Sequence, residues 1–355
     1  MKKIFIIGDA SSIHIAKWAD YFVNRDYDVH IATFARKNIT KVNNIHMLSS
    51  KKADIRGGNF HYILAIPKIV KLLKNIQPDI VNAHYSYSIG FISLIAKKIS
   101  NIQCIFSVVC HGSDILIPPA EILTGKINKF VLMNSDKIFA VSDQIRDKID
   151  TFNLKKKHNI YVGQYGVCTK ELAKNSKNTK KDIDILSNRA YDPNSRIDEL
   201  LEYIDQSNMK HLKIVFIVPA INDKNFKILR KKYPYIDFHK HLAYFDMIKM
   251  MQRSKIYISN TKSDGTSLSL LESMACGCIP VVSNIVSNRS WILDGINGFL
   301  FYNKNEFTEK LKYAINNFNE INFMNDININ IIHNKASYIN EMQKIEKFLF
   351  KIDSE

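Results

Sequence analysis

The sequence predicts an α/β protein with two doubly wound domains, each built on a parallel β-sheet. Short apolar runs alternate along the whole chain with stretches of helical periodicity, which is the pattern of repeated βαβ units. At 355 residues the chain is too long for one ordinary core. A segment at 169–182, rich in Lys, Asn and Ser, divides two such alternations, and we expect it to be the interdomain linker.

The first half opens with a βαβ pattern. Lys3–Ile7 is an apolar run typical of a buried strand, a helical stripe runs from Ile15 to Phe22, and Val29–Thr33 is the next strand. The glycine pattern G-x-G-x-x-G is absent, so this opening is not a dinucleotide fingerprint. Further strands are expected at 45–48, 79–83, 104–108 and 137–141, and helices at 66–73 and 121–133.

Polar side chains follow three of these strands directly. His84 and Tyr85 come after the strand at 79–83, His111 to Asp114 after the run at 104–109, and Ser142 after the strand at 137–141. Because ligands of parallel sheets bind at the carboxyl ends of the strands, these residues are expected at one candidate binding edge.

The second half repeats the alternation and ends in a helix. A helix is predicted at 267–276, with Thr266 as its N-cap and Gly277 ending it. An apolar stripe from Tyr338 to Ile352 predicts the last helix. Strands are expected at 183–187, 212–218, 235–239, 255–259, 279–283 and 298–301.

Two acids stand out around the helix at 267–276. Asp264 lies in the preceding loop, and Glu272 falls inside the apolar arc of the helix, where a carboxylate needs a hydrogen-bonding partner. The loop brings the backbone N–H groups of Gly265 to Ser269 to a helix N-terminus. Such a place suits an anion, particularly a phosphate.

The stretch from Lys255 to Phe301 resembles the carboxy-terminal signature of glycosyltransferase family 4, the retaining GT-B sugar transferases. The resemblance is carried by Glu272, by Ser273–Val282 and by Asp294–Phe301, and more loosely by His-Gly-Ser-Asp at 111–114. It implies a GT-B fold, with two Rossmann-like domains at 1–168 and 183–335 facing a central cleft. A final helix at 336–355 would cross back to the first domain.

The resemblance also implies roles for individual residues. Arg189 would stabilise the donor diphosphate, with Arg196 near the position of a family lysine that is here Asn194, and Glu272 would accept from the ribose hydroxyls. Asp264, where the family usually has Glu, and His111 would lie by the donor sugar. The remaining donor-binding residues implied are Gly265, Thr266, Ser267 and Leu268, and those on the acceptor side are Ser11, Ser12, His14, His84 and Asp114.

The activity implied is retaining, metal-independent transfer of a hexose from a UDP- or GDP-linked donor, without a cofactor. The acceptor would be a glycan or lipid-linked saccharide in the synthesis of lipopolysaccharide or capsule. Two alternatives stay open: a GT-B nucleotide-sugar epimerase, and a catalytically silent partner subunit. Asp182-Ile183-Asp184 spells a metal-binding D-x-D motif, but strand alternation explains it equally, and His239 with His241 lacks further zinc ligands.

The net charge of +16 is concentrated in the first half of the chain. Residues 1–170 hold 24 Lys and Arg against 12 Asp and Glu, whereas residues 171–355 hold 26 against 22. This charge favours an anionic membrane surface or a polyanionic acceptor, and a merely solvated lysine-rich surface explains it as well. No nucleic-acid-binding signature is present. Five cysteines without zinc spacing, no signal peptide and no long apolar run indicate a cytoplasmic protein, peripheral at the membrane if bound to it.

Overall fold

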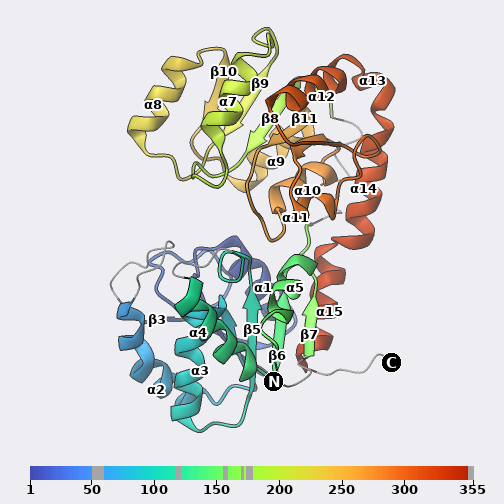
Figure 1. The fold of residues 1–355 in the computed structure, drawn as a ribbon. Helices are drawn as coiled ribbons and strands as arrows, with labels where there is room; N and C mark the ends of the chain where they lie inside the picture. The colour runs from blue at the N-terminus through green and yellow to red at the C-terminus, as the bar shows by residue number, and fades with distance from the viewer. Residues whose placement is uncertain (50–59, 117–120, 155–158, 169–171, 173–178, 351–355) are drawn as a thin grey trace. The chain divides into compact units, whose positions relative to one another are not determined.

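The computed structural model describes residues 1–49, 60–116, 121–154, 159–168, 172 and 179–350 (Figure 1). The chain forms two compact units. Unit 1 comprises Met1–Tyr165 with Glu341–Glu355, and unit 2 comprises Gly166–Asn340. The linker predicted at 169–182 lies largely outside the described residues and stays a prediction.

Unit 1 is built on a parallel sheet whose described strands run in the order β3-β2-β1-β4-β5-β6-β7. Every strand pair in it is parallel, and the order turns back between β1 and β4, as in a doubly wound sheet. The strands are β1 (Lys3–Ile7), β2 (Asp28–Thr33), β3 (Asn44–Met47), β4 (Ile80–His84), β5 (Ile105–Cys110), β6 (Lys137–Ala140) and β7 (Asn159–Val162).

Helices cover both faces of this sheet (Figure 1). Trp18 of the first helix packs on Phe139, and Phe348 of the last helix packs on Tyr161, the register partner of Phe139, so both helices lie on one face. The helical elements of unit 1 are α1 (Ile13–Val23), the 3-10 turn η1 (Phe60–Ala65), α2 (Ile66–Ile76), the π-turn η2 (Ser86–Gly90), α3 (Phe91–Ser100), α4 (Glu121–Met133), α5 (Asp143–Asp150) and α15 (Tyr338–Phe350).

Unit 2 has a second parallel sheet, with its described strands in the order β10-β9-β8-β11-β12-β13. Its side chains alternate between two cores: Ile256 and Ile258 of β11 enter one, and Tyr257 between them enters the other. The strands are β8 (Ile183–Asn188), β9 (Ile214–Ile217), β10 (Ile236–His239), β11 (Ser254–Ser259), β12 (Ile279–Ser283) and β13 (Phe299–Phe301).

The helices of unit 2 divide between these two cores. Residues of α7, α8, α12 and α13 line one core and residues of α9 and α10 line the other, while α14 contributes Met324 to the first and Ile332 to the second. The helices are α7 (Ile197–Asp205), α8 (Asp223–Lys232), α9 (Tyr244–Arg253), α10 (Leu268–Ala275), α11 (Val286–Arg289), α12 (Lys304–Asn316), α13 (Phe318–Ile321) and α14 (Phe323–Lys335).

The predicted fold class of two doubly wound, parallel-sheet halves is confirmed. One local prediction is wrong: the N-cap of α10 is Ser267 rather than Thr266. The Ser267 side chain accepts from the backbone N–H of Leu270, whereas the Thr266 hydroxyl donates to the Gly265 carbonyl. Gly277 does end the helix, at a positive φ of 70°.

The last helix, α15, is joined to the rest of unit 1 through Glu346. This buried carboxylate accepts hydrogen bonds from the hydroxyls of Tyr21 and Tyr27, both at 2.7 Å, and lies 3.4 Å from Arg25. Both carboxylate oxygens of Glu346 therefore accept hydrogen bonds from residues of α1 and of the turn after it. The end of the chain is thereby part of the amino-terminal unit.

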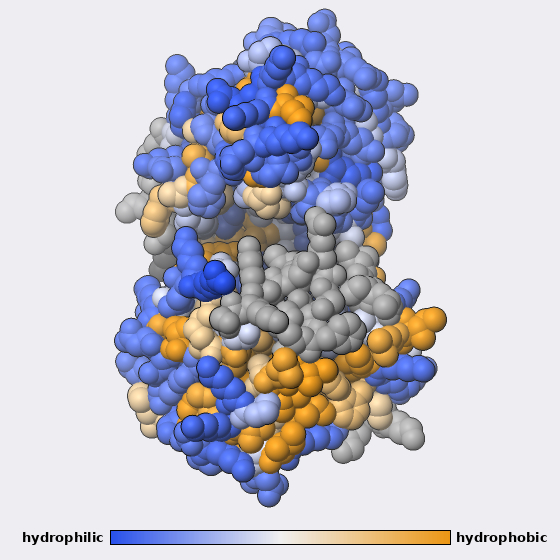
Figure 2. Space-filling view, turned by 90° about the vertical axis from the view of Figure 1, so that its left-hand side faces the viewer, coloured by the Kyte–Doolittle hydropathy of each residue, from blue (hydrophilic) through white to orange (hydrophobic). Residues whose placement is uncertain are grey.

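Unit 1 also exposes apolar side chains beside lysines. Leu64 of η1 is 80% exposed, and Ile122 of α4 is 83% exposed. These two elements belong to one contiguous group, because η1 contacts α2, α2 contacts α3, and α3 contacts α4. Figure 2 faces the side of unit 1 on which α2 lies in Figure 1, and it shows hydrophobic residues gathered there. Within the described part of the chain, no helix is both long enough and apolar enough to cross a bilayer.

Candidate functional site

The candidate donor site in unit 2 lies where β8 ends and α10 begins. Arg189 directly follows β8, and its guanidinium Nη1 donates to Ser267 Oγ at 2.8 Å while Nη2 donates to Asp264 Oδ2 at 2.9 Å. Ser267 Oγ in turn caps the Leu270 N–H. A cation, a helix N-terminus and an acid from the preceding loop are therefore held together.

The start of α10 keeps donor capacity of its own. The first-turn N–H groups of a helix have no intrahelical acceptor. The Ser267 side chain accepts from the Leu270 N–H, which leaves the N–H groups of Leu268 and Ser269 as the donors at the helix start. Their dipoles add to the positive end of the helix macrodipole. Together with Arg189 they form an anion-binding arrangement.

Glu272 lies one turn further along α10, with only 5% of its surface exposed. The hydroxyl of Tyr244, the first residue of α9, donates to Glu272 Oε1 at 3.2 Å. Burial, and then the charge of Glu272, raises the pKa of Tyr244, so the phenol stays protonated and able to donate. The hydrogen-bonding partner that the apolar surroundings of Glu272 require is thus present.

Arg196 does not join this cluster through any contact of its own. Its guanidinium donates to the backbone carbonyl and side-chain oxygen of Asn260, both at 2.7 Å, and pairs with Glu199 at 3.3 Å. It therefore supports the loop that follows β11. Asn194 supports the same loop, because its side chain donates to the Ser263 carbonyl and accepts from the Ser263 N–H.

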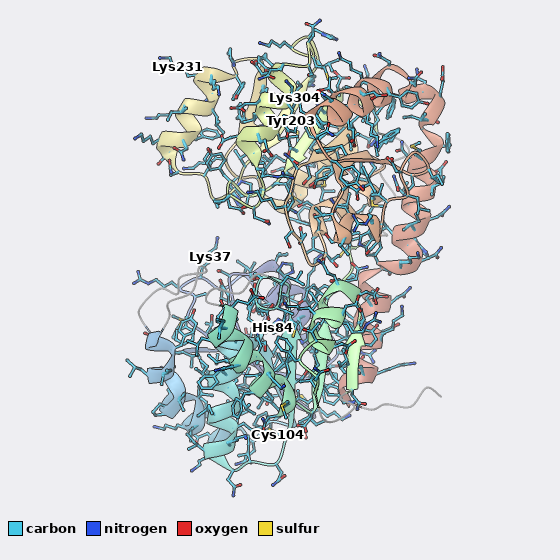
Figure 3. All side chains as sticks on the ribbon, viewed as in Figure 1. Lys37, His84, Cys104, Tyr203, Lys231 and Lys304 are labelled. Carbon is cyan, nitrogen blue, oxygen red and sulfur yellow. The ribbon has the colours of Figure 1, made fainter. Side chains whose placement is uncertain are left out.

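The candidate residues of unit 1 gather around His111, at the carboxyl end of the sheet. His84 Nδ1 lies 3.0 Å from His111 Nε2, and the ring of His14 lies 5.6 Å from that of His111. Figure 3 shows His84 at this end of the sheet and Cys104, which precedes β5, at the other. His84 is the last residue of β4 rather than the residue after it, so its side chain is buried.

Asp114 holds the loop that carries His111. Its carboxylate accepts from the backbone N–H groups of Ser86, His111 and Gly112 at 2.8 to 3.0 Å. Burial raises the pKa of Asp114 and these three backbone donors act against that rise. Because Asp114 is buried, its side chain fixes the loop and does not present an oxygen to solvent.

Ser11 and Ser12 both serve the turn between β1 and α1. The Ser11 N–H and hydroxyl donate to Asp9 Oδ1 at 2.8 and 2.6 Å, and Ser12 is the N-cap of α1. These hydroxyls shape the turn that brings His14 next to His111. The family resemblance implied all three on the acceptor side, and the structure puts His14 in ring contact with the cluster.

Family models match both units. A model described as glycosyl transferase 4-like matches residues 3–142, and a model described as glycosyl transferases group 1 matches residues 169–330. The chain belongs to the GT-B glycosyltransferases. An uncharacterized glycosyltransferase from Methanocaldococcus jannaschii is 25% identical to it over 305 residues, covering 82% of this chain and 81% of that protein.

Solved structures share the fold of this GT-B glycosyltransferase. HepE of Anabaena, in complex with UDP and glucose, superposes with a TM-score of 0.79 at 13% identity, over 99% of this chain and all of that one. Sucrose-phosphate synthase from Thermosynechococcus elongatus gives a TM-score of 0.76 at 12% identity, over 98% of each chain. At such identities the likeness shows the fold alone.

Several residues of this glycosyltransferase escaped the sequence analysis. Tyr165 and Tyr244 contact predicted site residues, yet each is distant in sequence from its partner. The only local signal was the glycine on either side of Gln164-Tyr165. Asn188, whose side chain reaches Met247 Sδ at 2.9 Å and Ser269 Oγ at 3.5 Å, was not identified from the sequence.

The two acids of the D-x-D sequence are occupied by basic side chains. Arg253 donates to both oxygens of Asp182, Lys213 pairs with Asp182 at 2.8 Å, and Lys255 pairs with Asp184 at 2.7 Å. Arg253 and Lys213 lower the pKa of Asp182, the hydrogen bond from Arg253 most strongly. The motif therefore serves to join strand ends by ion pairs.

Proposed function

We propose that this protein is a retaining, metal-independent family 4 hexosyltransferase acting on a nucleotide-linked sugar. The observation that carries the proposal is the contact of Arg189 with Ser267 and Asp264 at the start of α10. It supports a site in unit 2 for the diphosphate of a UDP- or GDP-linked donor. HepE of Anabaena, which shares the fold, has been solved with UDP and glucose bound.

Departure of a nucleoside diphosphate requires that its negative charge be stabilised. The planar guanidinium of Arg189 matches phosphate oxygens in a bidentate manner, and the amides of Leu268 and Ser269 add fixed dipoles. These groups would do the work that a metal ion does in other transferases. The loop at Gly265 and Thr266 precedes the Ser267 cap and would close around the same phosphate.

Glu272 and Asp264 would bind the two ends of the donor. Glu272 is a carboxylate on a rigid helix, with Tyr244 holding one oxygen, and it would accept from the vicinal ribose hydroxyls. Asp264, which contacts the other nitrogen of Arg189 from the one that meets Ser267, would accept from hydroxyls of the sugar. Its arm is one carbon shorter than that of a glutamate, so the family role requires a closer approach of the sugar.

Unit 1 would provide His111 to the reacting sugar and would bind the acceptor. The sugar gains positive charge as the donor bond breaks, and an uncharged imidazole is compatible with that charge. Burial, with smaller contributions from His84 and His14, lowers the pKa of His111 well below its usual range. The departing phosphate would take the proton of the acceptor hydroxyl.

The exposed face of unit 1 supports an anionic membrane as a partner. Residues 60–76, 91–100 and 121–133, which form η1, α2, α3 and α4, contain seven lysines and one glutamate. Apolar side chains are exposed among them, as Figure 2 shows. Apolar groups that enter the lipid boundary beside lysines that meet anionic headgroups are typical of peripheral membrane binding. We call this surface the membrane face; its exposed apolar residues are Ile63, Leu64, Ile99, Ile122, Leu123 and Phe130.

A membrane face of this kind fits an acceptor that is lipid-linked. We therefore propose a surface-glycan intermediate, of the lipopolysaccharide or capsule type, as the acceptor class at the cytoplasmic side of a membrane. The donor would arrive from solution, while the acceptor would remain in the bilayer.

The function is tested by a panel of UDP- and GDP-linked hexoses with EDTA present throughout. A cognate donor should raise the unfolding temperature of the protein by mass action. That donor is then incubated with lipid-linked saccharides, and the anomeric configuration of the product is read by NMR. Transfer with retention supports the proposal, conversion of the donor without any acceptor supports an epimerase, and binding without either reaction supports a silent subunit.

A further inference from the structure

The ring of His111 is held by side chains of unit 1 on more than one side. His84 Nδ1 lies 3.0 Å from His111 Nε2, and the Tyr165 hydroxyl lies 3.1 Å from Nδ1 and 3.3 Å from Nε2. The ring of Tyr85 stacks on the imidazole, with centroids 4.3 Å apart and planes at 25°. Both ring nitrogens therefore meet protein groups that come from different elements of the fold.

We propose that His84 and Tyr165 are positioning residues that hold His111 as a single neutral tautomer, with its proton on Nδ1. The inference rests on the proposed function, because the charge on His111 matters only if a positively charged sugar forms beside it. His84 would act through His111 and would not touch the substrate, since its side chain is fully buried.

The surroundings of His84 Nε2, the ring nitrogen that does not face His111, decide which histidine donates in the His84–His111 hydrogen bond. A neutral imidazole carries one N–H, so His84 has its proton on Nδ1 or on Nε2. Among the described residues, the buried atoms His84 Nε2 and Trp18 Nε1 have no hydrogen-bond partner. Their rings meet edge to face, with centroids 5.3 Å apart and planes at 87°.

An indole nitrogen can only donate. With an N–H at His84 Nε2, both unpartnered atoms of these adjoining rings would be donors, and two donors cannot satisfy each other. A bare Nε2 is an acceptor, so only in that tautomer are the two unpartnered groups complementary. His84 then carries its proton on Nδ1 and donates it to His111 Nε2, which leaves the proton of His111 on Nδ1, facing Tyr165.

Burial keeps both rings uncharged. It lowers the pKa of His84 to about 3, and the His111 ring shares those surroundings. A positive charge on His111 would require N–H groups on both nitrogens and would lie against His84 and His14. Geometry and burial therefore agree that His111 is a neutral ring whose Nε2 lone pair is occupied by His84.

The backbone at Tyr85 is strained in a way that maintains this arrangement. Tyr85 has φ 77° and ψ 126°, a conformation that costs a non-glycine residue on the order of 1–3 kcal/mol. Its N–H donates to the Val109 carbonyl, its carbonyl accepts from Gly90, and the next N–H, of Ser86, donates to Asp114. These bonds hold the Tyr85 ring over the imidazole.

The inference is tested by ring-nitrogen NMR of the full chain labelled with ¹⁵N-histidine, with the His111 signals assigned by their loss in His111→Gln. In the unsubstituted protein at neutral pH, His111 should show one tautomer, protonated on Nδ1. His84→Asn is the matched control, because an asparagine side-chain amide can take the place of the Nδ1–H donor. His84→Leu removes the donor at a similar volume and should give a mixture of tautomers.

Activity provides the second arm of the test. His84→Leu should lower kcat about tenfold to a hundredfold, the range seen for residues that orient a functional histidine, with little change in the KM for the donor, while His84→Asn retains most of kcat. If His84→Leu does not fold, Tyr165→Phe removes one oxygen and should shift the Nδ1 signal of His111. The inference is overturned, even in an active enzyme, if His111 of the unsubstituted protein is protonated on Nε2. It is also overturned if the His111 signals in His84→Leu or Tyr165→Phe are the same as in the unsubstituted protein. A tautomer shift in a protein that transfers no sugar supports the inference and contradicts the proposed function instead.

Discussion

Arg189 and Asp264 form an ion pair at the entrance to α10, with Nη2 of the arginine 2.9 Å from Oδ2 of the aspartate. Both side chains are partly buried, so the pair is less screened than a surface ion pair. The arginine is therefore already aligned before any ligand is bound. A phosphate arriving at the helix start would compete with Asp264 for the guanidinium, which makes the two residues separable by mutation.

Arg189→Ala should abolish measurable nucleotide binding. The substitution removes the cation and both of its hydrogen bonds to Ser267 and Asp264. Arg189→Lys should restore only part of the affinity, because an ammonium cannot form the planar, bidentate contact. Calorimetric titration with UDP and GDP measures this, and equal affinities of the lysine variant and the unsubstituted protein would contradict the planar contact.

Asp264→Asn should lower transfer without lowering nucleotide binding. It frees the Arg189 guanidinium from a competing carboxylate, so the affinity for a nucleoside diphosphate is expected to stay the same or rise. Transfer should fall if the carboxylate also contacts the sugar. The two constants are measured by titration and by steady-state kinetics, and a parallel loss of both would show that Asp264 acts only by orienting Arg189.

Glu272→Gln should weaken donor binding about tenfold to a hundredfold. Hydrogen bonds to a charged acceptor contribute about 1.5–3 kcal/mol, and every 1.4 kcal/mol is a factor of ten in affinity. Tyr244→Phe is the control, since it removes the 3.2 Å bond to Glu272 without removing the carboxylate, and its effect should be smaller. Titration with a nucleoside diphosphate is compared with titration with a diphosphate that carries no ribose. If Glu272 contacts the ribose, the variant should lose affinity only for the nucleoside diphosphate, whereas a folding defect would weaken the binding of both.

Acid should destabilise unit 1 through its buried histidines. The pKa of His84 is about 3 in the folded protein and about 6.5 when unfolded, so the unfolded chain binds more protons between these values. Stability is fully present above pH 6.5 and falls as the pH drops towards 3, by at most about 1.4 kcal/mol per pH unit for this group. Denaturant unfolding at several pH values measures the slope.

The slope should be shallower in His84→Leu than in the unsubstituted protein. Replacing the exposed His333 by Gln is the control, and it should leave the slope as it was. Identical slopes in all three proteins would show that His84 does not titrate on unfolding in this range.

Charges introduced on the membrane face should release the protein from anionic vesicles. Leu123→Asp places a carboxylate among the lysines and apolar groups of α4, and sedimentation with phosphatidylserine vesicles should show weaker binding than for the unsubstituted protein. Leu293→Asp is the matched control, because Leu293 of unit 2 is 61% exposed, close to the 57% of Leu123.

Salt should weaken vesicle binding as well, since about 1 kcal/mol per lysine comes from the anionic surface. Vesicles without anionic lipid should bind the protein poorly. Equal binding of Leu123→Asp and Leu293→Asp would place the membrane contact elsewhere on the chain.

The parallel architecture could be predicted from sequence because its signal is local. The apolar run Lys3–Ile7 and the run Ile279–Ser283 are strands with the bounds expected, and Glu121–Met133 is a helix as expected. The position of Glu272 could also be predicted, because helical periodicity alone puts it on a buried face. Short strands without a strong apolar run, such as β7 at Asn159–Val162, were missed.

The partners of the site residues could not be predicted, because they depend on tertiary contacts. Tyr165 meets His111 across 54 residues of sequence, and Tyr244 reaches Glu272 from another helix. The cap of α10 was misplaced by one residue, since Thr266 and Ser267 have the same capping chemistry and only the backbone decides between them. Arg196 was expected beside the donor, and its contacts instead join it to Asn260 and Glu199.

The central claim is that a nucleoside diphosphate binds where Arg189 meets the start of α10. The most direct test is a crystal structure of the protein with a UDP- or GDP-linked sugar, grown without divalent metal. The account predicts diphosphate oxygens within hydrogen-bonding distance of the Arg189 guanidinium and the amides of Leu268 and Ser269, with the ribose hydroxyls on Glu272. A diphosphate bound elsewhere, with Arg189 still paired only to Asp264 and Ser267, would contradict it.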